Sequence, residues 1–397
     1  MLSQVRQRRR TAKETEGSSA GERRFSQKLD YSINNEASRM NPLRAEVFEQ
    51  RVEKVAERLR SSSVEAVILC SPANVYYFTG YRGGVLYASA DGTLILFSSL
   101  PVSTPLADRI EIVEKLGRRD PVMMALEYLG DRRMSLGYDT MTVEAYQAVI
   151  RSAPSVSMVS VKDLVYELRQ VKSEEEVSLL RRACETVSMA MEVVRQVISY
   201  GTTVADIRRA VADSVYRAGA ELAYNPRVFF GDDTFLNSDS PAEREVRRGE
   251  LIKLQIGVVV EHYVASLSRT YFYGEKPPEK LVKFYSSLLK LKDEVRSSLA
   301  PWSSAISIYD KCRSFALTLG FEPSTLTYFG KGVGLEEAEP PFIHAGSADI
   351  VREGAVVNVG PELLIPGRFG LSVSDVYHVS ATGPQPLTEA SIELELG

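Results

Sequence analysis

The sequence predicts a two-domain protein of the α/β (α+β) class. Helical and strand-like segments alternate from residue 42 to about residue 161, an order that is typical of an α/β domain. From residue 171 the order becomes two helices, two strands, two helices and two strands, which hints at an internal duplication. The chain has 397 residues, more than the roughly 250 to 300 at which a single core stops growing. Two domains, each with its own core, are therefore expected.

The first domain is expected over residues 41–165. Apolar residues recur every three or four positions between Pro42 and Arg60, which predicts an amphipathic helix. A short apolar strand follows at Ala66 to Leu69. The dipeptide Asp91-Gly92 separates "VLYASA" from "TLILF" and predicts a tight β-hairpin. Residues 1–40 are basic and polar without apolar periodicity, so a disordered tail is expected there.

The second domain is expected over residues 166–397. Ser173 and Glu176 form a capping box at the start of a long amphipathic helix. A second helix is predicted from Thr203 to Ala218. Strand-like runs such as "LIKLQIGVVV" and "YVASLSRTYFY" follow, and "VVVEHYV" is read as the hairpin turn that contains His262. Helices are predicted near residues 279–299 and 305–319, before the strands "AVVNVGPELLI" and "LSVSDVYHVSA".

Composition and charge exclude several classes of protein for this chain. The chain is 44% hydrophobic and 25% charged, which is ordinary for a globular protein, and no apolar run approaches a membrane-spanning helix. Three separated cysteines indicate neither a disulfide framework nor a cysteine-based zinc site. A cytoplasmic protein is therefore expected. The net charge of −4 gives no indication of nucleic-acid binding, and no membrane partner is expected.

Several motifs occur in a specific order between about residues 42 and 390. They are "SPANVYYFTGY", "LRQVKSEEEVSLLRRAC", "FFGDD", "GKGVGLEEAEPP" and "IPGRFGLSVSD". In this order they resemble the family of aminopeptidase P, prolidase (Xaa-Pro dipeptidase), methionine aminopeptidase and creatinase. The resemblance implies a creatinase-type N-terminal domain followed by a domain with the pita-bread fold. It also implies a homodimer, because the creatinase-type N-terminal domain often contributes to dimers.

Peptidases of this family bind two metal ions with two aspartates, one histidine and two glutamates, and the resemblance places these ligands on five positions of this chain. The five positions are Gln255, Ser266, Lys331, Gly360 and Ser374. All five depart from the family pattern, so a cage with four negative charges becomes neutral except for one ammonium group. Paired divalent cations need several carboxylates. We therefore expect no metal, no cofactor, no catalytic residues and no metallopeptidase activity.

Other polar residues of the motifs are candidates for a remaining pocket. They are Ser238, Arg269, Glu339 and Asp375. Lys331 is expected to fill the abandoned cavity, where it could pair with Glu339 or Asp375; a role as a catalytic base is the alternative. The three histidines, His262, His344 and His378, are expected to be solvated or structural. We do not expect Glu362 to replace the acid lost at Gly360, because a register shift turns a strand side chain to the opposite face.

Three readings of function follow from the resemblance as aligned, and a fourth follows if the alignment of the ligands is wrong. The first is a catalytically inactive homologue of Xaa-Pro peptidases that binds a peptide or a protein, as the peptidase-like domain of the large FACT histone-chaperone subunit exemplifies. The second is a metal-independent hydrolase of a small C–N-bonded substrate, like creatinase, although the histidine on which creatinase relies corresponds to a position near Ser238. A residual Xaa-Pro peptidase remains if the ligand alignment is wrong. The third is a subunit that dimerises with an active paralogue.

Overall fold

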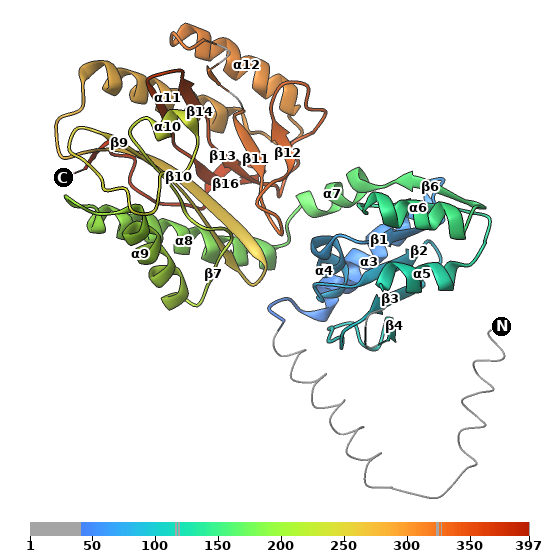
Figure 1. Ribbon diagram of the computed structural model, residues 1–397. Helices are drawn as coiled ribbons and strands as arrows, with labels where there is room; N and C mark the ends of the chain where they lie inside the picture. The colour runs from blue at the N-terminus through green and yellow to red at the C-terminus, as the bar shows by residue number, and fades with distance from the viewer. Residues whose placement is uncertain (1–40, 116, 118–119, 323–324, 327, 397) are drawn as a thin grey trace, which may run out of the picture. The chain divides into compact units, whose positions relative to one another are not determined.

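The computed structural model describes residues 41–115, 117, 120–322, 325–326 and 328–396, so the expected basic tail lies outside the described residues (Figure 1). The chain divides into two compact units, with the main boundary between Ser157 and Met158 and the segment Ser135–Thr140 assigned to the second unit. Among the described residues, no helix is long and apolar enough to cross a membrane.

A six-stranded sheet organises the N-terminal part of the chain, in the order β4-β3-β2-β1-β5-β6. Its strands are β1 (Ala66–Leu69), β2 (Val85–Ser89), β3 (Leu94–Ser98), β4 (Glu111–Glu114), β5 (Met134–Tyr138) and β6 (Val156–Ser160). The helices of this region are α3 (Ala45–Arg60), α4 (Pro72–Thr79), α5 (Pro121–Leu129) and α6 (Val143–Ser152). The predicted Asp91-Gly92 hairpin is confirmed: β2 and β3 pair antiparallel, and Gly92 has a φ of 89°.

The helices of the C-terminal part begin with α7 (Lys162–Gln170), α8 (Glu174–Val197) and α9 (Val204–Arg217). The predicted capping box at Ser173 and Glu176 is present at the start of α8, and Thr203 and Asp206 form a second one on α9. The short α10 (Asp233–Leu236), α11 (Glu279–Ser298) and α12 (Ala305–Thr318) follow. The predicted order of helix pairs and strand pairs is confirmed in outline.

Two five-stranded sheets and one two-stranded sheet form the strand layer of this unit. The first five-stranded sheet contains β7 (Glu221–Leu222), β8 (Arg227–Phe230), β9 (Leu251–Val260), β10 (Tyr263–Tyr273) and β18 (Glu395–Leu396). The second contains β11 (Gly330–Gly332), β12 (Glu339–Ile343), β13 (Val356–Val359), β16 (Asp375–Ser380) and β17 (Gly383–Pro386), while β14 (Glu362–Ile365) pairs with β15 (Phe369–Ser372).

The helices cover these sheets from different sides. Helix α8 packs on β9 and β10, and α11 packs on β13 and β17 (Figure 1). One apolar core joins Leu288, Leu291 and Val295 of α11 to Val357 and Val359 of β13. Burying such aliphatic side chains stabilises the fold by about 1.5 to 3 kcal/mol each. This core fixes α11 against the sheet that contains β13. The two five-stranded sheets form two β-layers, which contact each other where β10 meets β16.

Glycines of the "GKGVG" segment allow β11 to approach β12 closely. A Cβ atom at Gly332 would lie 2.6 Å from the carbonyl oxygen of Glu339 and would also overlap the carbonyl oxygen of Pro340. Both neighbours are backbone atoms, so they cannot rotate away. The glycine is therefore required by the strand pairing and not by any chemistry of the loop.

We predict that Gly332→Ala lowers the free energy of unfolding by about 1 to 3 kcal/mol, the usual effect of inserting a methyl group into a closely packed site. Urea unfolding measures the change. Gly83→Ala is the matched control, because a Cβ atom there would meet the Tyr81 ring at an ordinary 3.4 Å. Equal stability of the two variants would contradict the assignment of a packing role to Gly332.

Candidate functional site

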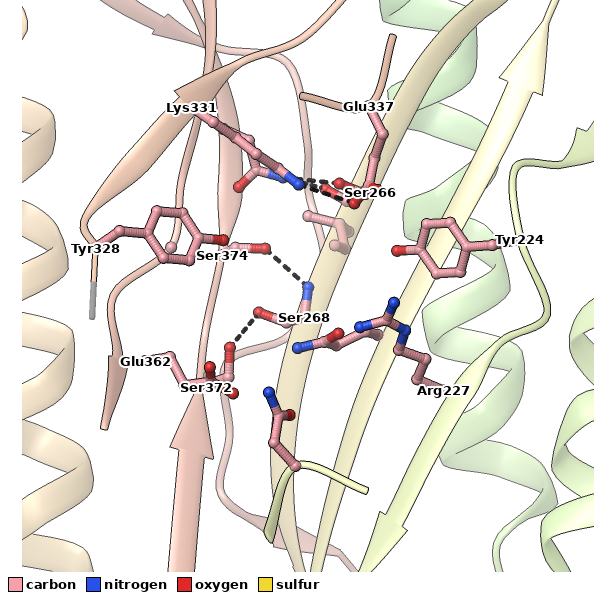
Figure 2. Close-up of a pocket in the computed structure, with 15 residues that line it drawn as sticks. Tyr224, Arg227, Ser266, Ser268, Tyr328, Lys331, Glu337, Glu362, Ser372 and Ser374 are labelled. Atoms are coloured by element: carbon pink, nitrogen blue, oxygen red, sulfur yellow. Dashed lines mark hydrogen bonds and ion pairs between the residues drawn. The ribbon is translucent and has the colours of Figure 1, made fainter. Parts of the chain in front are cut away.

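A polar cavity of about 210 Å³ lies between the β9–β10 hairpin and the strands β11, β13 and β14 (Figure 2). All five positions that the sequence aligns with the family's metal ligands line this cavity. They are Gln255, Ser266, Lys331, Gly360 and Ser374. The other lining residues are Tyr224, Arg227, Asn237, Leu267, Ser268, Tyr328, Glu337, Asn358, Glu362 and Ser372.

Strand register brings these residues together. In the β9–β10 hairpin, Ser268 is the register partner of Gln255, and Ser266 lies two residues before Ser268 on the same face. Lys331 of β11 is the register partner of Asn358 on β13. Residues that are 76 positions apart in the sequence, such as Gln255 and Lys331, therefore face one cavity.

Hydroxyl groups bind one another at the centre of the cavity. The Ser268 backbone N–H donates to Ser374 Oγ at 2.8 Å, and the hydroxyl oxygens of Ser268 and Ser372 lie 2.7 Å apart (Figure 2). The amide of Asn358 donates to the Ser266 carbonyl oxygen at 2.7 Å and to its hydroxyl oxygen at 3.1 Å. Neutral hydrogen bonds thus join the two β-layers across the cavity.

Gly360 closes another side of the cavity by direct contact. A Cβ atom at this position would lie only 2.5 Å from the Cβ atom of Ser374, a separation that real Cβ atoms do not adopt. The chain therefore needs a glycine at residue 360 while the segment carrying Ser374 keeps its present position. A single change of Gly360 to glutamate would not restore a carboxylate ligand here without moving that segment.

Lys331 is neutralised inside the cavity by Glu337. Its ammonium lies 2.9 Å from Glu337 Oε1, and Figure 2 shows the two side chains pointing toward each other. The expectation that Lys331 could pair with Glu339 or Asp375 is wrong, because both of these acids are held by other cations. Glu337 belongs to the loop between β11 and β12, and nothing in the motif indicated that its side chain turns back over the cavity.

A second ion pair joins Lys253 and Glu362. Lys253 Nζ lies 2.8 Å from Glu362 Oε1 and also donates to the Thr234 carbonyl oxygen at 2.7 Å and to Asn237 Oδ1 at 3.0 Å. The lysine is completely buried. Burial lowers the pKa of its ammonium, and the Glu362 carboxylate opposes this effect. Removing either side chain would therefore leave the other as a buried charge without its partner.

The position of Glu362 corrects an expectation from the sequence. We did not expect its side chain to reach the place of the acid lost at Gly360, yet Glu362 lines the same cavity. The chain leaves β13 at Val359 and enters β14 at Glu362, so the register shift assumed for one continuous strand does not apply here. The Glu362 carboxylate thus lines the cavity two residues after Gly360, and Lys253 neutralises it.

The four residual candidates lie outside the lining of the cavity. Ser238 is exposed in the loop after α10. Asp375 is buried, with its carboxylate bound by Arg269 at 2.6 Å and by Lys292. Glu339 is also buried, bound by Lys172 at 2.7 Å and by Arg169. Arg269, Glu339 and Asp375 are thus components of buried ion-pair clusters that support the surrounding strands.

The residues present do not fit a pair of divalent metal ions. In the part of the chain that the structure describes, no cluster of three or more His, Cys, Asp or Glu side chains is placed to hold a metal. His262 lies in the β9–β10 turn with a φ of 74°, as predicted for the hairpin, while His344 is exposed and His378 lies on β16. The cavity's two carboxylates, Glu337 and Glu362, are each occupied by a lysine.

The fold and the cavity together define a class: a creatinase-like N-terminal α/β domain followed by a pita-bread domain, as the sequence predicted. The chain belongs to metallopeptidase family M24, whose model matches residues 178–381. The model of the creatinase/prolidase N-terminal domain matches residues 51–171. The protein is thus a member of the Xaa-Pro peptidase-like group, and the predicted resemblance is confirmed.

Known proteins are similar over nearly the whole folded chain. A Xaa-Pro dipeptidase of Pyrococcus horikoshii is 24% identical over 354 residues, covering 88% of this chain and 99% of the relative. An uncharacterized peptidase of Staphylococcus aureus (strain USA300) is 24% identical over 348 residues, covering 85% and 98%. The crystal structure of the prolidase from P. horikoshii matches with a TM-score of 0.77 at 23% identity, covering 87% of this chain and 99% of that one.

The N-terminal domain of the FACT complex subunit SPT16 from chickpea has the same fold. It matches with a TM-score of 0.73 at 15% identity and covers 89% of this chain and 99% of that domain. At such identities these likenesses establish the fold alone.

The Glu339 cluster generates a prediction about stability and pH. Burial by itself would raise the pKa of Glu339, but Lys172 and Arg169 hold it below its usual value of 4.5. Glu339→Gln leaves two buried cations without their carboxylate, so we predict a loss of about 3 to 5 kcal/mol in the free energy of unfolding at pH 7. Urea unfolding measures it, with Glu353→Gln on the surface as control.

The same variant has a defined pH dependence. Since the folded-state pKa is depressed, the stabilisation is fully present above the ordinary pKa near 4.5 and is lost as the pH falls through the folded value. The difference between wild type and Glu339→Gln should therefore shrink with acidification below about pH 4.5. A difference that stays constant from pH 7 to pH 3 would contradict the pairing.

The Lys253–Glu362 pair predicts that substitutions of the two residues have non-additive effects on the free energy of unfolding. Lys253→Met should destabilise the protein by about 3 to 5 kcal/mol, because a buried carboxylate loses its cation. The double variant Lys253→Met, Glu362→Gln should recover most of that loss, since both charges are gone. Urea unfolding of both single variants and the double variant completes the cycle. Losses that simply add would show that the two side chains stabilise the fold independently.

Proposed function

We propose that the protein is a metal-free member of family M24 that binds a peptide or a protein and has no metallopeptidase activity. One observation supports this proposal above others: the five positions corresponding to the family's metal ligands surround one cavity and carry an amide, two hydroxyls, an ammonium and no side chain. The two carboxylates on the cavity wall are already paired with lysines. Hard divalent cations need several available carboxylates and an open position for water.

The alternative of metal-independent hydrolysis has less support. Among the described residues that line the cavity there is no histidine, and Ser238 is not part of the wall. Lys331 as a catalytic base would first have to leave its ion pair with the Glu337 carboxylate, which lies 2.9 Å from its ammonium. The inactive binding role therefore agrees better with the cavity.

The assembly of the chain remains a prediction. A homodimer, or a complex with an active paralogue, follows only from the resemblance of the N-terminal domain. Sedimentation equilibrium of the purified chain distinguishes a monomer from a homodimer directly. A dimer that forms only after addition of a second family member would favour the paralogue reading.

We predict that the protein purified with excess Mn²⁺ or Co²⁺ contains no stoichiometric metal and does not hydrolyse Xaa-Pro dipeptides or creatine. Elemental analysis and an amino-acid release assay measure the two properties. The Xaa-Pro dipeptidase of P. horikoshii, prepared in the same way, is the positive control. Binding of about two ions per chain would overturn the proposal, and so would turnover that exceeds that of Lys331→Met.

A further inference from the structure

Part of the cavity wall is already paired internally. Glu337 accepts from Lys331 at 2.9 Å, and Glu362 accepts from Lys253 at 2.8 Å, so a lysine balances the charge of each carboxylate. The hydroxyls of Ser268 and Ser372 bind each other, and the Ser266 hydroxyl oxygen accepts from Asn358. The two carboxylates therefore add no net negative charge to the cavity.

Several donors on the wall have no such engagement. Among the described residues, the Arg227 guanidinium, the Gln255 amide and the Tyr328 hydroxyl make no hydrogen bond or ion pair, and they all line the cavity. Burial raises the pKa of Tyr328 to about 12, so its phenol keeps its proton at neutral pH and can donate. Asn237 uses its oxygen to accept from Lys253, which leaves its NH₂ group available.

Arg227 supplies the one cation of the wall that no carboxylate neutralises within the described chain. It lies on β8, where its register partner is Gln255 of β9, and Gln255 is in turn the partner of Ser268 on β10. Its guanidinium lies 5.7 Å from the centre of the Tyr224 ring, and Figure 2 shows it entering the cavity beside Ser268. Arg227 is exposed at the mouth of the cavity, and a guanidinium beside an amide is suited to a planar oxyanion, which it can bind through two parallel N–H groups.

We infer that the cavity binds a small carboxylate, with Arg227 as the residue that contacts the carboxylate and Gln255 as an additional donor. The inference rests on the proposed function, because a site filled by two metal ions would have a different charge. It adds the ligand class: where family peptidases hold cations, this chain presents a cation and donors to an anion. Both a peptide C-terminus and a free organic acid carry the required group.

Isothermal titration calorimetry with four probes tests the inference on the full chain. The probes are sodium acetate, the dipeptide Gly-Pro, Gly-Pro amide and glycinamide. We expect Gly-Pro or acetate to bind while the two amides do not. Gly-Pro binding more tightly than acetate would identify a peptide C-terminus as the source of the carboxylate, and equal affinities would identify a free organic acid.

Variants of Arg227 test whether this residue contacts the carboxylate. Arg227→Gln should weaken binding of the carboxylate about 10- to 100-fold, the usual effect of removing a charge-assisted hydrogen bond. Arg227→Lys should give an intermediate affinity, because it keeps the charge without the planar fork. Arg217→Gln, another exposed arginine at the end of α9, is the matched control and should bind like wild type.

The outcomes separate this inference from the proposed function. Binding that is equal for carboxylates and amides, unchanged in Arg227→Gln, or undetectable for all four probes overturns the carboxylate assignment and leaves the metal-free proposal intact. Stoichiometric Mn²⁺ in the same preparation overturns the proposed function instead. Unfolding curves of both glutamine variants show whether a loss of binding reflects a loss of folded protein.

Discussion

The site depends on the need to pair every buried carboxylate with a positive charge. An ionised carboxylate taken out of water without a partner is strongly unfavourable. In this chain the partners of the buried acids are built in: Lys253 for Glu362, and pairs of cations for Glu339 and Asp375. The half-exposed Glu337 at the rim of the cavity is paired with Lys331. The negative charges of the region therefore need no metal ion to stabilise them.

The strand framework of the family is present, while the side chains at the five aligned ligand positions differ from the family pattern. Small residues at the metal-ligand positions let the two β-layers come together, as the contact between Gly360 and Ser374 shows. Serine hydroxyls then join the layers with neutral hydrogen bonds. At Gly360 the absence of a side chain permits the close contact with Ser374, and at Ser266 and Ser374 hydroxyl groups take part in hydrogen bonds between the layers.

Local patterns were sufficient to predict most of the fold. The capping box at Ser173, the Asp91-Gly92 hairpin and the apolar period of the long helices are determined by neighbouring residues, so a sequence reveals them directly. The order of the motifs placed the five aligned ligand positions that line the cavity, but the four other candidates predicted for the pocket, Ser238, Arg269, Glu339 and Asp375, lie outside the lining. The partner of Lys331 was mispredicted because it depends on how the loop after β11 folds back, and Glu362 was misjudged because the direction of its side chain depends on local strand geometry.

The most direct test of the account is the thermal unfolding midpoint of the full chain with and without Mn²⁺. A ligand that binds only the folded state raises this midpoint in proportion to its affinity and concentration. The account predicts no change at millimolar Mn²⁺, while the Xaa-Pro dipeptidase of P. horikoshii measured in parallel should be stabilised. A rise of several degrees that Lys331→Met leaves intact would contradict the claim that built-in cations have replaced the metal.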